Sequence, residues 1–254
     1  MTVEKLEING ISTGYGDIQA LWDISLSVEP GHATVLLGPN GAGKSTTLSA
    51  IMGLLPLWKG TITWRGRNIG DVPAHRRVHL GLSLVQENKR VFKKRTVEEN
   101  LVLAGYTTVK GRRELRKRMD EQYDRFPILK QRAKLPASTL SGGEQQMLAI
   151  AQALIPAPTI LILDEPTAGL APVIVKALFE VFGRLKAEGH GLLLVEQVVH
   201  HALQLADDVS VLSVGRVAHR AKAEELTDKS VIEEVYFGAR PLKVEPNGST
   251  TTEG

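Results

Sequence analysis

The chain has 254 residues, of which 43% are hydrophobic and 23% charged, and a formal net charge of +3. This length predicts one or two domains, and the composition excludes wholesale disorder and fibrous repeats. The absence of cysteine excludes a disulfide framework and thiolate chemistry. No stretch approaches the ~20 apolar residues that cross a bilayer, and the N-terminus lacks the apolar core of a signal peptide. We therefore expect a soluble protein that reaches a membrane only through a partner.

The positive charge is concentrated in residues 89–134, which contain fifteen Lys/Arg and six Asp/Glu and so carry a local net charge of +9. A basic segment can bind nucleic acid or an anionic membrane surface. A solvated helical face is the other interpretation, and we favour it because the sequence has neither an RNP-type aromatic pattern nor zinc-finger spacing. We expect no nucleic-acid partner.

The N-terminal part of the chain predicts strands that alternate with helices. Residues 24–28 alternate apolar and polar side chains, as a half-buried strand does. Residues 33–37 are almost wholly apolar and precede a glycine-rich turn, which is typical of a buried parallel strand. The pattern further predicts a helix at 44–52 and strands at 61–64 and 82–85.

A charged helical segment interrupts this alternation. Thr96 and Glu99 have the spacing of a capping box, in which each side chain satisfies the backbone at the other residue. From there to about Pro158 the chain is poor in strand signals. We interpret this segment as an inserted helical subdomain.

The alternation of strands and helices then resumes. A helix is predicted to begin at Pro172 and to end near Gly189, with apolar residues at helical spacing between them. Residues 241–254 are rich in Pro, Gly, Ser and Thr and predict a disordered tail. Buried strands are predicted at 159–163, 192–195 and 209–214.

Residues 38–45 match the phosphate-binding motif G-x-x-x-x-G-K-[ST] in full and lie between a predicted strand and a predicted helix. Glycines allow several backbone N–H groups to point at one anion, and the helix adds its positive N-terminal end. Lys44 would supply charge to the β- and γ-phosphates, and Ser45 a hydroxyl to Mg²⁺. The predicted nucleotide-binding residues here are Gly38, Pro39, Asn40, Gly41, Ala42, Gly43, Lys44, Ser45 and Thr46.

The apolar strand at 159–163 ends in two carboxylates, Asp164 and Glu165. A strand next to the phosphate-loop strand would deliver Asp164 to the Mg²⁺ shell. Glu165 lies where the chain turns, so it can face the γ-phosphate and polarise a water molecule as a general base. A solvated loop acid is the alternative for Glu165.

A second glycine-containing helix start follows in the sequence Leu-Ser-Gly-Gly-Glu-Gln-Gln at 140–146. Ser141 and Glu144 have capping-box spacing. Two successive glycines reduce rigidity, and a second phosphate that approaches this helix N-terminus would explain them. We do not expect one chain to close both motifs on one nucleotide, so a dimer that shares nucleotides across its interface is the natural arrangement.

The motifs GPNGAGKST, LSGGEQQ and ILILDEP together resemble those of ATP-binding subunits of ABC transporters. The resemblance covers about residues 3–240. It implies an α/β fold, with a P-loop NTPase (RecA-like) core, an antiparallel β subdomain and an inserted helical subdomain. The core and β subdomain would occupy about 1–95 and 159–240, and the helical subdomain about 96–158.

The resemblance also implies roles for individual residues. Tyr15 matches the aromatic residue that stacks on adenine. Gln86 matches the glutamine that joins the Mg²⁺ and water shell and senses the membrane subunits. The implied cofactors are ATP and Mg²⁺. The implied metal ligands are Ser45, Gln86 and Asp164. The implied catalytic residues are Glu165, Gln197 and Lys44. Ser141, Gly142 and Gly143 would hold the γ-phosphate of the ATP that is bound to the opposite subunit.

Three positions depart from the general family pattern. Gln197 stands where a histidine usually contacts the γ-phosphate, and glutamine can donate a hydrogen bond but cannot become cationic near neutral pH. His200 and His201 are expected on the surface of the following helix. Ala171 stands where aspartate is common, and the spacing around Gln86 is one residue longer than usual.

Four segments, at 90–92, 96–101, 168–172 and 195–197, resemble the smaller ATPase subunit of branched-chain amino acid importers. This resemblance implies work with a second ATPase subunit, two membrane permeases and, indirectly, a solute-binding protein, at the cytoplasmic face of the inner membrane. Urea and short-amide importers have a very similar ATPase. Two further alternatives stay open: a weakly catalytic nucleotide switch, which Gln197 and Ala171 favour, and a nucleic-acid ATPase, which the basic stretch favours.

Overall fold

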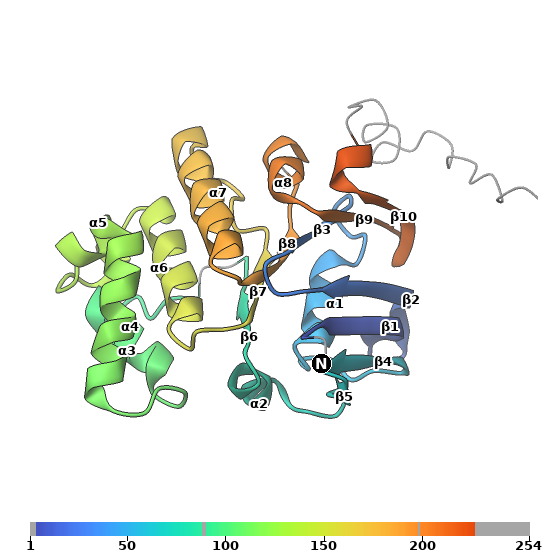
Figure 1. Ribbon diagram of the computed structural model, residues 1–254, viewed down its shortest axis with the longest axis horizontal. Coiled ribbons are helices and arrows are strands. Elements are labelled where there is room, and N and C mark those ends of the chain that lie inside the picture. The colour runs from blue at the N-terminus through green and yellow to red at the C-terminus, as the bar shows by residue number, and fades with distance from the viewer. Residues whose placement is uncertain (1–3, 88–89, 198, 227–254) are drawn as a thin grey trace, which may run out of the picture.

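The computed structural model describes residues 4–87, 90–197 and 199–226. They form a six-stranded central sheet and a four-stranded antiparallel sheet beside it (Figure 1). The central sheet contains, in spatial order, β10 (Arg216–Lys222), β9 (Asp208–Ser213), β3 (Ala33–Leu37), β8 (Gly191–Val195), β7 (Ile160–Asp164) and β6 (Leu82–Val85). The second sheet contains β2 (Ile18–Val28), β1 (Leu6–Tyr15), β4 (Lys59–Trp64) and β5 (Arg67–Asn68).

Five strands of the central sheet run parallel, and β10 alone is antiparallel to its neighbour β9. Side chains alternate between the two faces of such strands. In β3, Val35 and Leu37 join one apolar core, whereas Leu36 joins the other. The continuous apolar runs of the sequence therefore reflect strands that are buried on both faces.

The two cores are covered by different elements (Figure 1). The core on the Leu36 side is closed by the antiparallel sheet and by α1 (Lys44–Ile51). The opposite core is covered by α7 (Pro172–Ala187) and α8 (Val199–Leu205) and continues into the helices between β6 and β7. These helices are α3 (Val97–Gly105), α4 (Arg112–Arg125), α5 (Pro127–Gln131) and α6 (Gly142–Leu154). A further short helix, α2 (Ala74–His79), precedes β6.

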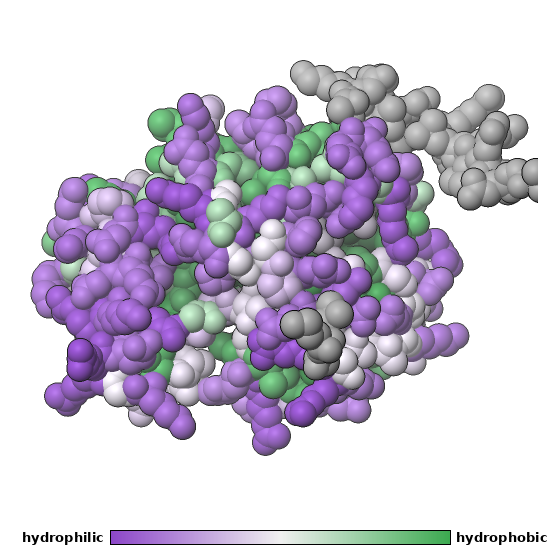
Figure 2. Space-filling model, viewed as in Figure 1, coloured by the Kyte–Doolittle hydropathy of each residue, from purple (hydrophilic) through white to green (hydrophobic). Residues whose placement is uncertain are grey.

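The start of the helical segment matches its sequence signal. Thr96 caps α3, with its hydroxyl accepting from the Glu99 backbone N–H while the Glu99 carboxylate accepts from the Thr96 N–H. On α4, basic and acidic side chains pair at one-turn spacing, for example Arg118 with Glu114. Much of the surface of this segment is hydrophilic (Figure 2), as a solvated helical face requires.

The predicted architecture, an α/β core with an antiparallel sheet and a helical insertion, is confirmed, but one neighbour relation is wrong. The strand that carries Asp164, β7, does not lie next to the phosphate-loop strand β3, because β8 lies between them. Strands β1 and β10 and helix α2 lacked a clear sequence signal. In β10 the side chains are only half-buried or exposed, so they show no apolar periodicity.

A buried arginine joins α2 to α1. Arg77 has no exposed surface, and its guanidinium donates hydrogen bonds to the carbonyl oxygens of Ala50 and Ile51 at the C-terminal end of α1. It also donates to the carbonyls of Gly70 and Val72. Burial lowers the pKa of Arg77 to about 10, partly opposed by the charge of Asp71. The cation is therefore held at the negative end of the α1 dipole.

Within the described ranges, no helix combines the length and the apolar character needed to cross a bilayer. The predicted disordered tail at 241–254 lies outside the described residues.

Candidate nucleotide-binding site

The phosphate-binding motif forms the loop between β3 and α1, as predicted. Gly43 is the N-cap of α1 and has a φ of 102°, and a Cβ at this position would lie 2.6 Å from a Leu21 methyl group. Only glycine fits both the left-handed backbone and this close packing. The loop therefore presents the N-terminus of an eight-residue helix to the cavity above it.

A cavity of about 540 Å³ lies over this loop. Lys44, Ser45 and Thr46 line it from the first turn of α1, and Glu165 and Gln197 line it from the ends of β7 and β8. Ligands of parallel sheets bind at this carboxyl edge of the strands. The remaining lining residues are Gln19, Ala20, Trp22, Asn40, Gly41, Gly43, Glu87, Val214 and Gly215.

Lys44 is buried and its ammonium group is held by the loop itself. Its Nζ donates to the carbonyl oxygens of Gly38 (2.8 Å) and Pro39 (3.1 Å) and lies 3.4 Å from Glu165 Oε1. An ammonium group has three donors, so these three acceptors match it. Lys44 is thus positioned between the phosphate loop and the carboxylate that follows Asp164.

Glu165 and Gln197 contact each other across the cavity. Gln197 Nε2 lies 2.7 Å from Glu165 Oε2 and 2.9 Å from Asn40 Oδ1, and donates to both. Glu165 has a φ of 45°, which is unusual for a residue with a side chain, and its N–H donates to the Val195 carbonyl. The structure therefore brings together Asn40, Lys44, Glu165 and Gln197 from three loops.

Asp164 is the last residue of β7, and its Oδ1 accepts a hydrogen bond of 3.1 Å from Ser45 Oγ. This contact forms although β7 is not adjacent to β3, because α1 extends from the phosphate loop to contact β7. Burial raises the pKa of Asp164 to about 6, and the charges of Glu165 and Glu87 also raise it, whereas the Ser45 hydrogen bond and Lys44 lower it. A hydroxyl and a buried carboxylate are oxygen ligands that suit Mg²⁺.

The raised pKa of Asp164 predicts a pH-dependent stability in metal-free buffer. The folded protein holds the Asp164 proton more tightly than the unfolded chain, whose pKa is near 3.8. The free energy of unfolding should therefore fall by about 2 kcal/mol between pH 4 and pH 6 from this group. Asp164→Asn should raise the free energy of unfolding above that of the wild type at pH 7.5, and should raise it by less at pH 4. Urea unfolding of both proteins at both pH values, with chelator present, measures the difference. An equal effect of the substitution at both pH values would contradict the pKa assignment.

Tyr15 lies at the end of β1, at the edge of this site. Its hydroxyl is 3.4 Å from Thr46 Oγ1, and its side chain is largely exposed. Among the residues that line the cavity the aromatic one is Trp22, which the sequence analysis did not identify. No motif marked Trp22, since its position depends on the packing of β2 against the turn at Val214 and Gly215, where the backbone N–H of Trp22 donates to the Gly215 carbonyl.

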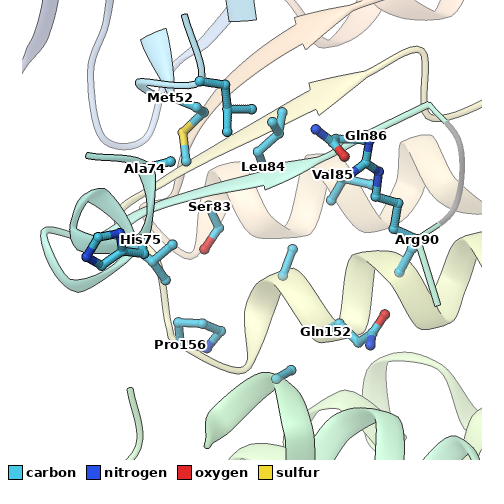
Figure 3. Close-up of a pocket in the computed structure, with 15 residues that line it drawn as sticks. Met52, Ala74, His75, Ser83, Leu84, Val85, Gln86, Arg90, Gln152 and Pro156 are labelled. Atoms are coloured by element: carbon cyan, nitrogen blue, oxygen red, sulfur yellow. The ribbon is translucent and has the colours of Figure 1, made fainter. Parts of the chain in front are cut away.

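The structure separates Gln86 from the phosphate loop. Gln86 lines a different cavity, a groove of about 460 Å³ between the central sheet and the helical segment, where it lies near Arg90 (Figure 3). Its neighbour Glu87 lines the phosphate-loop cavity instead. The sequence did carry a signal for this difference. The spacing from Gln86 to Phe92 is one residue longer than usual, and the usual spacing, counted back from Phe92, ends at Glu87.

The second glycine motif lies at the N-terminus of α6, outside the phosphate-loop cavity. Ser141 and Glu144 form the predicted capping box. A Cβ at Gly143 would lie 3.1 Å from Ile174, so packing within the chain accounts for one of the two glycines. Ser141, Gly142 and Gly143 do not line the cavity over Lys44 of the same chain.

Ala171 and the two histidines after Gln197 do not line this cavity. His200 is exposed on α8 as predicted, whereas His201 is half-buried with its ring centroid 5.3 Å from that of Phe179. Ala171 is the N-cap of α7.

Comparison with known proteins gives one consistent family. The ABC transporter family matches residues 21–168. The high-affinity branched-chain amino acid transport ATP-binding protein BraG of Pseudomonas aeruginosa is 41% identical over 92% of this chain and 99% of its own length. The probable branched-chain amino acid transport ATP-binding protein LivF of Archaeoglobus fulgidus is 39% identical over 90% of this chain and 96% of its own.

Solved structures of similar chains agree with this family. One is described as an ATP binding subunit of an ABC transporter and has a TM-score of 0.80 at 30% identity, over 91% of this chain and 98% of that one. The ADP conformation of MJ1267, an ATP-binding cassette of an ABC transporter, also has a TM-score of 0.80, at 28% identity over 94% of this chain and 99% of that one. The chain therefore belongs to the ABC transporter family and is an ATPase of the ATP-binding-cassette type.

Proposed function

We propose that this chain is the ATP-hydrolysing subunit of an importer of branched-chain, hydrophobic amino acids. The observation that carries the proposal is its 41% identity to BraG over nearly the whole of both chains. The chain would act at the cytoplasmic face of the inner membrane through two permease subunits and, indirectly, a solute-binding protein. The solute assignment rests on the similarity to BraG and LivF.

Within this function, the phosphate loop and Lys44 bind the triphosphate of ATP. Ser45 and Asp164 fit Mg²⁺, since both offer oxygen atoms and already lie within hydrogen-bond distance of each other. The metal, when bound, would neutralise phosphate charge. Glu165 acts as the general base for the attacking water, and Gln197 orients it and the γ-phosphate through its amide. Tyr15 and Trp22 offer aromatic faces to the adenine.

A second ATPase subunit is needed to complete the site. Ser141, Gly142 and Gly143 lie at the N-terminus of α6, the positive end of its dipole, but outside the cavity that contains Lys44. A second subunit, either a related chain or another copy, would place its own serine–glycine motif over this cavity. ATP then favours the closed pair and ADP does not, which provides differential binding between two states.

The groove beside Gln86 is the surface that we assign to the permease. Its lining is mainly apolar and comes from α2, β6 and α6, with His75 and Pro156 at one end and Gln86 and Arg90 at the other (Figure 3). Glu87, the next residue after Gln86, faces the phosphate loop. A permease segment in the groove would therefore contact the residue adjacent to one that lines the nucleotide cavity.

We expect Glu87, rather than Gln86, to tune the Mg²⁺ requirement. Glu87→Gln removes a negative charge that acts on Asp164, so the Mg²⁺ concentration for half-maximal ATPase rate should rise about threefold or more. Gln86→Ala should leave that concentration unchanged and instead weaken the dependence of ATPase rate on the permease. Titration of ATPase activity with Mg²⁺ in the assembled complex measures both. A shift in Mg²⁺ dependence from Gln86→Ala alone would reverse the assignment.

Reconstituted transport tests the proposed solute. The chain, its second ATPase subunit, the permeases and the solute-binding protein are placed in proteoliposomes with internal ATP. Uptake of labelled leucine, isoleucine or valine that stops with Glu165→Gln supports the proposal. Uptake of urea or short amides instead would move the chain to that importer class. Nucleotide binding without measurable phosphate release would favour the weakly catalytic switch suggested by Gln197 and Ala171.

A further inference from the structure

A buried carboxylate lies at the carboxyl end of β8, next to the segments that carry Glu165 and Gln197. Glu196 follows the last residue of β8 and is only 1% exposed. Its Oε1 accepts two hydrogen bonds from Thr167, one from the backbone N–H (3.0 Å) and one from the hydroxyl (2.6 Å). Its Oε2 accepts a hydrogen bond from the N–H of Gln197 (3.1 Å). One side chain thus contacts the segment after β7 and the segment after β8.

These two segments carry the groups that meet over Lys44. Thr167 is two residues after Glu165, and Gln197 is the next residue after Glu196. Glu165 and Gln197 contact each other through a 2.7 Å hydrogen bond, and the N–H of Glu165 donates to the Val195 carbonyl. The distance between the Glu165 and Gln197 side chains therefore depends on the hydrogen bonds that join the segment after β7 to the segment after β8.

These contacts match a side chain that accepts hydrogen bonds at both of its ends. Thr167 donates twice to Oε1 and the Gln197 N–H donates to Oε2, and a carboxylate accepts at both oxygens. In Glu196→Gln, the side-chain NH₂ group would face either the Thr167 donors or the Gln197 N–H, so one set of hydrogen bonds would be lost in either orientation. Thr167 is itself buried, so water cannot readily replace the lost contact.

We propose that Glu196 is a positioning residue for ATP hydrolysis, which holds the general base Glu165 and the amide of Gln197 at their working separation. This rests on the proposed function, because it assigns a role relative to those two groups. Glu196 does not line the nucleotide cavity and acts only through the segments that it fastens.

The test compares turnover with nucleotide affinity in the assembled complex. Glu196→Gln should lower kcat by about 10- to 100-fold, because small displacements of reacting groups reduce rate strongly. The KM for ATP, and the Kd for Mg-ATP by calorimetry, should change less than about twofold, since the phosphate loop is untouched. Thr167→Val, which keeps the carboxylate and removes the hydroxyl donor, should lower kcat in the same direction. The double variant should lose less than the product of the two single effects.

A readout that does not involve activity separates this proposal from the proposed function. Amide hydrogen exchange at Thr167 and Gln197 should accelerate in Glu196→Gln, whereas exchange in β3 should not. If the wild-type complex hydrolyses no ATP while these amides respond, the proposed function fails and the fastening of the two segments stands. Unchanged kcat in Glu196→Gln, equal loss of kcat and affinity, or unchanged exchange at both amides would each overturn the inference. If Glu196→Gln does not fold, Thr167→Val decides the matter through the same kcat and KM comparison.

Discussion

Glu165→Gln is expected to lower kcat for ATP hydrolysis by about 10²- to 10⁴-fold while ATP affinity is retained. The Glu165 carboxylate lies beside Lys44 and accepts a hydrogen bond from Gln197 at the carboxyl edge of the sheet, and we propose that it activates the attacking water there. A glutamine has nearly the same shape but cannot accept the proton of that water. The phosphate loop, which holds the nucleotide, is not altered by the substitution.

Single-turnover and steady-state phosphate release by the assembled complex measure this effect. Glu180→Gln is a matched control, because Glu180 is an exposed glutamate on α7 and lies outside the nucleotide cavity. Its kcat should equal that of the wild type. A near-normal rate in Glu165→Gln would show that another group activates the water, and the general-base assignment would then be wrong.

Lys44→Ala is expected to raise the Kd for Mg-ATP by roughly 100-fold, equivalent to about 3 kcal/mol. The substitution removes the buried cation of the phosphate loop, which we propose to pair with the triphosphate, and hydrogen bonds between charged groups are the strong ones. It also removes the donor that serves the Pro39 carbonyl and the cation that pairs with Glu165. Some loss of thermal stability should therefore accompany the loss of binding.

Calorimetric titration with Mg-ATP, together with thermal unfolding, distinguishes the two effects. Lys176→Ala serves as the control, since Lys176 is an exposed lysine on α7 that does not line the nucleotide cavity. Wild-type affinity in a folded Lys44→Ala variant would remove the basis for placing the triphosphate on this loop.

The sequence predicted the phosphate loop and the two carboxylates well because their chemistry is local. A tight glycine turn, a helix start and a strand that ends in Asp164 are each specified by a few consecutive residues. The capping boxes at Thr96 and Ser141 are equally local, and both formed as predicted. Their roles in catalysis stay predictions until the variants are measured.

What the sequence could not reveal depends on contacts between distant segments. The order of the central sheet places β8 between β3 and β7, and no spacing along the chain encodes that order. Gln86 lines the groove whereas its neighbour Glu87 lines the nucleotide cavity, and the sequence signals this difference only through the unusual spacing to Phe92. Glu196 was visible only as part of a family pattern, since its partner Thr167 lies 29 residues away.

The buried guanidinium of Arg77 gives α1 a second anchor. The first turn of this helix carries Lys44 and Ser45, and its last carbonyls accept hydrogen bonds from Arg77 of α2. Ala74, His75 and Val78 of α2 line the groove that we propose for a permease. Eight residues of helix span only ~12 Å. The helix that begins at the phosphate loop is therefore fixed at its other end to α2, so a displacement of α2 would reach Lys44 and Ser45 through about two turns of helix.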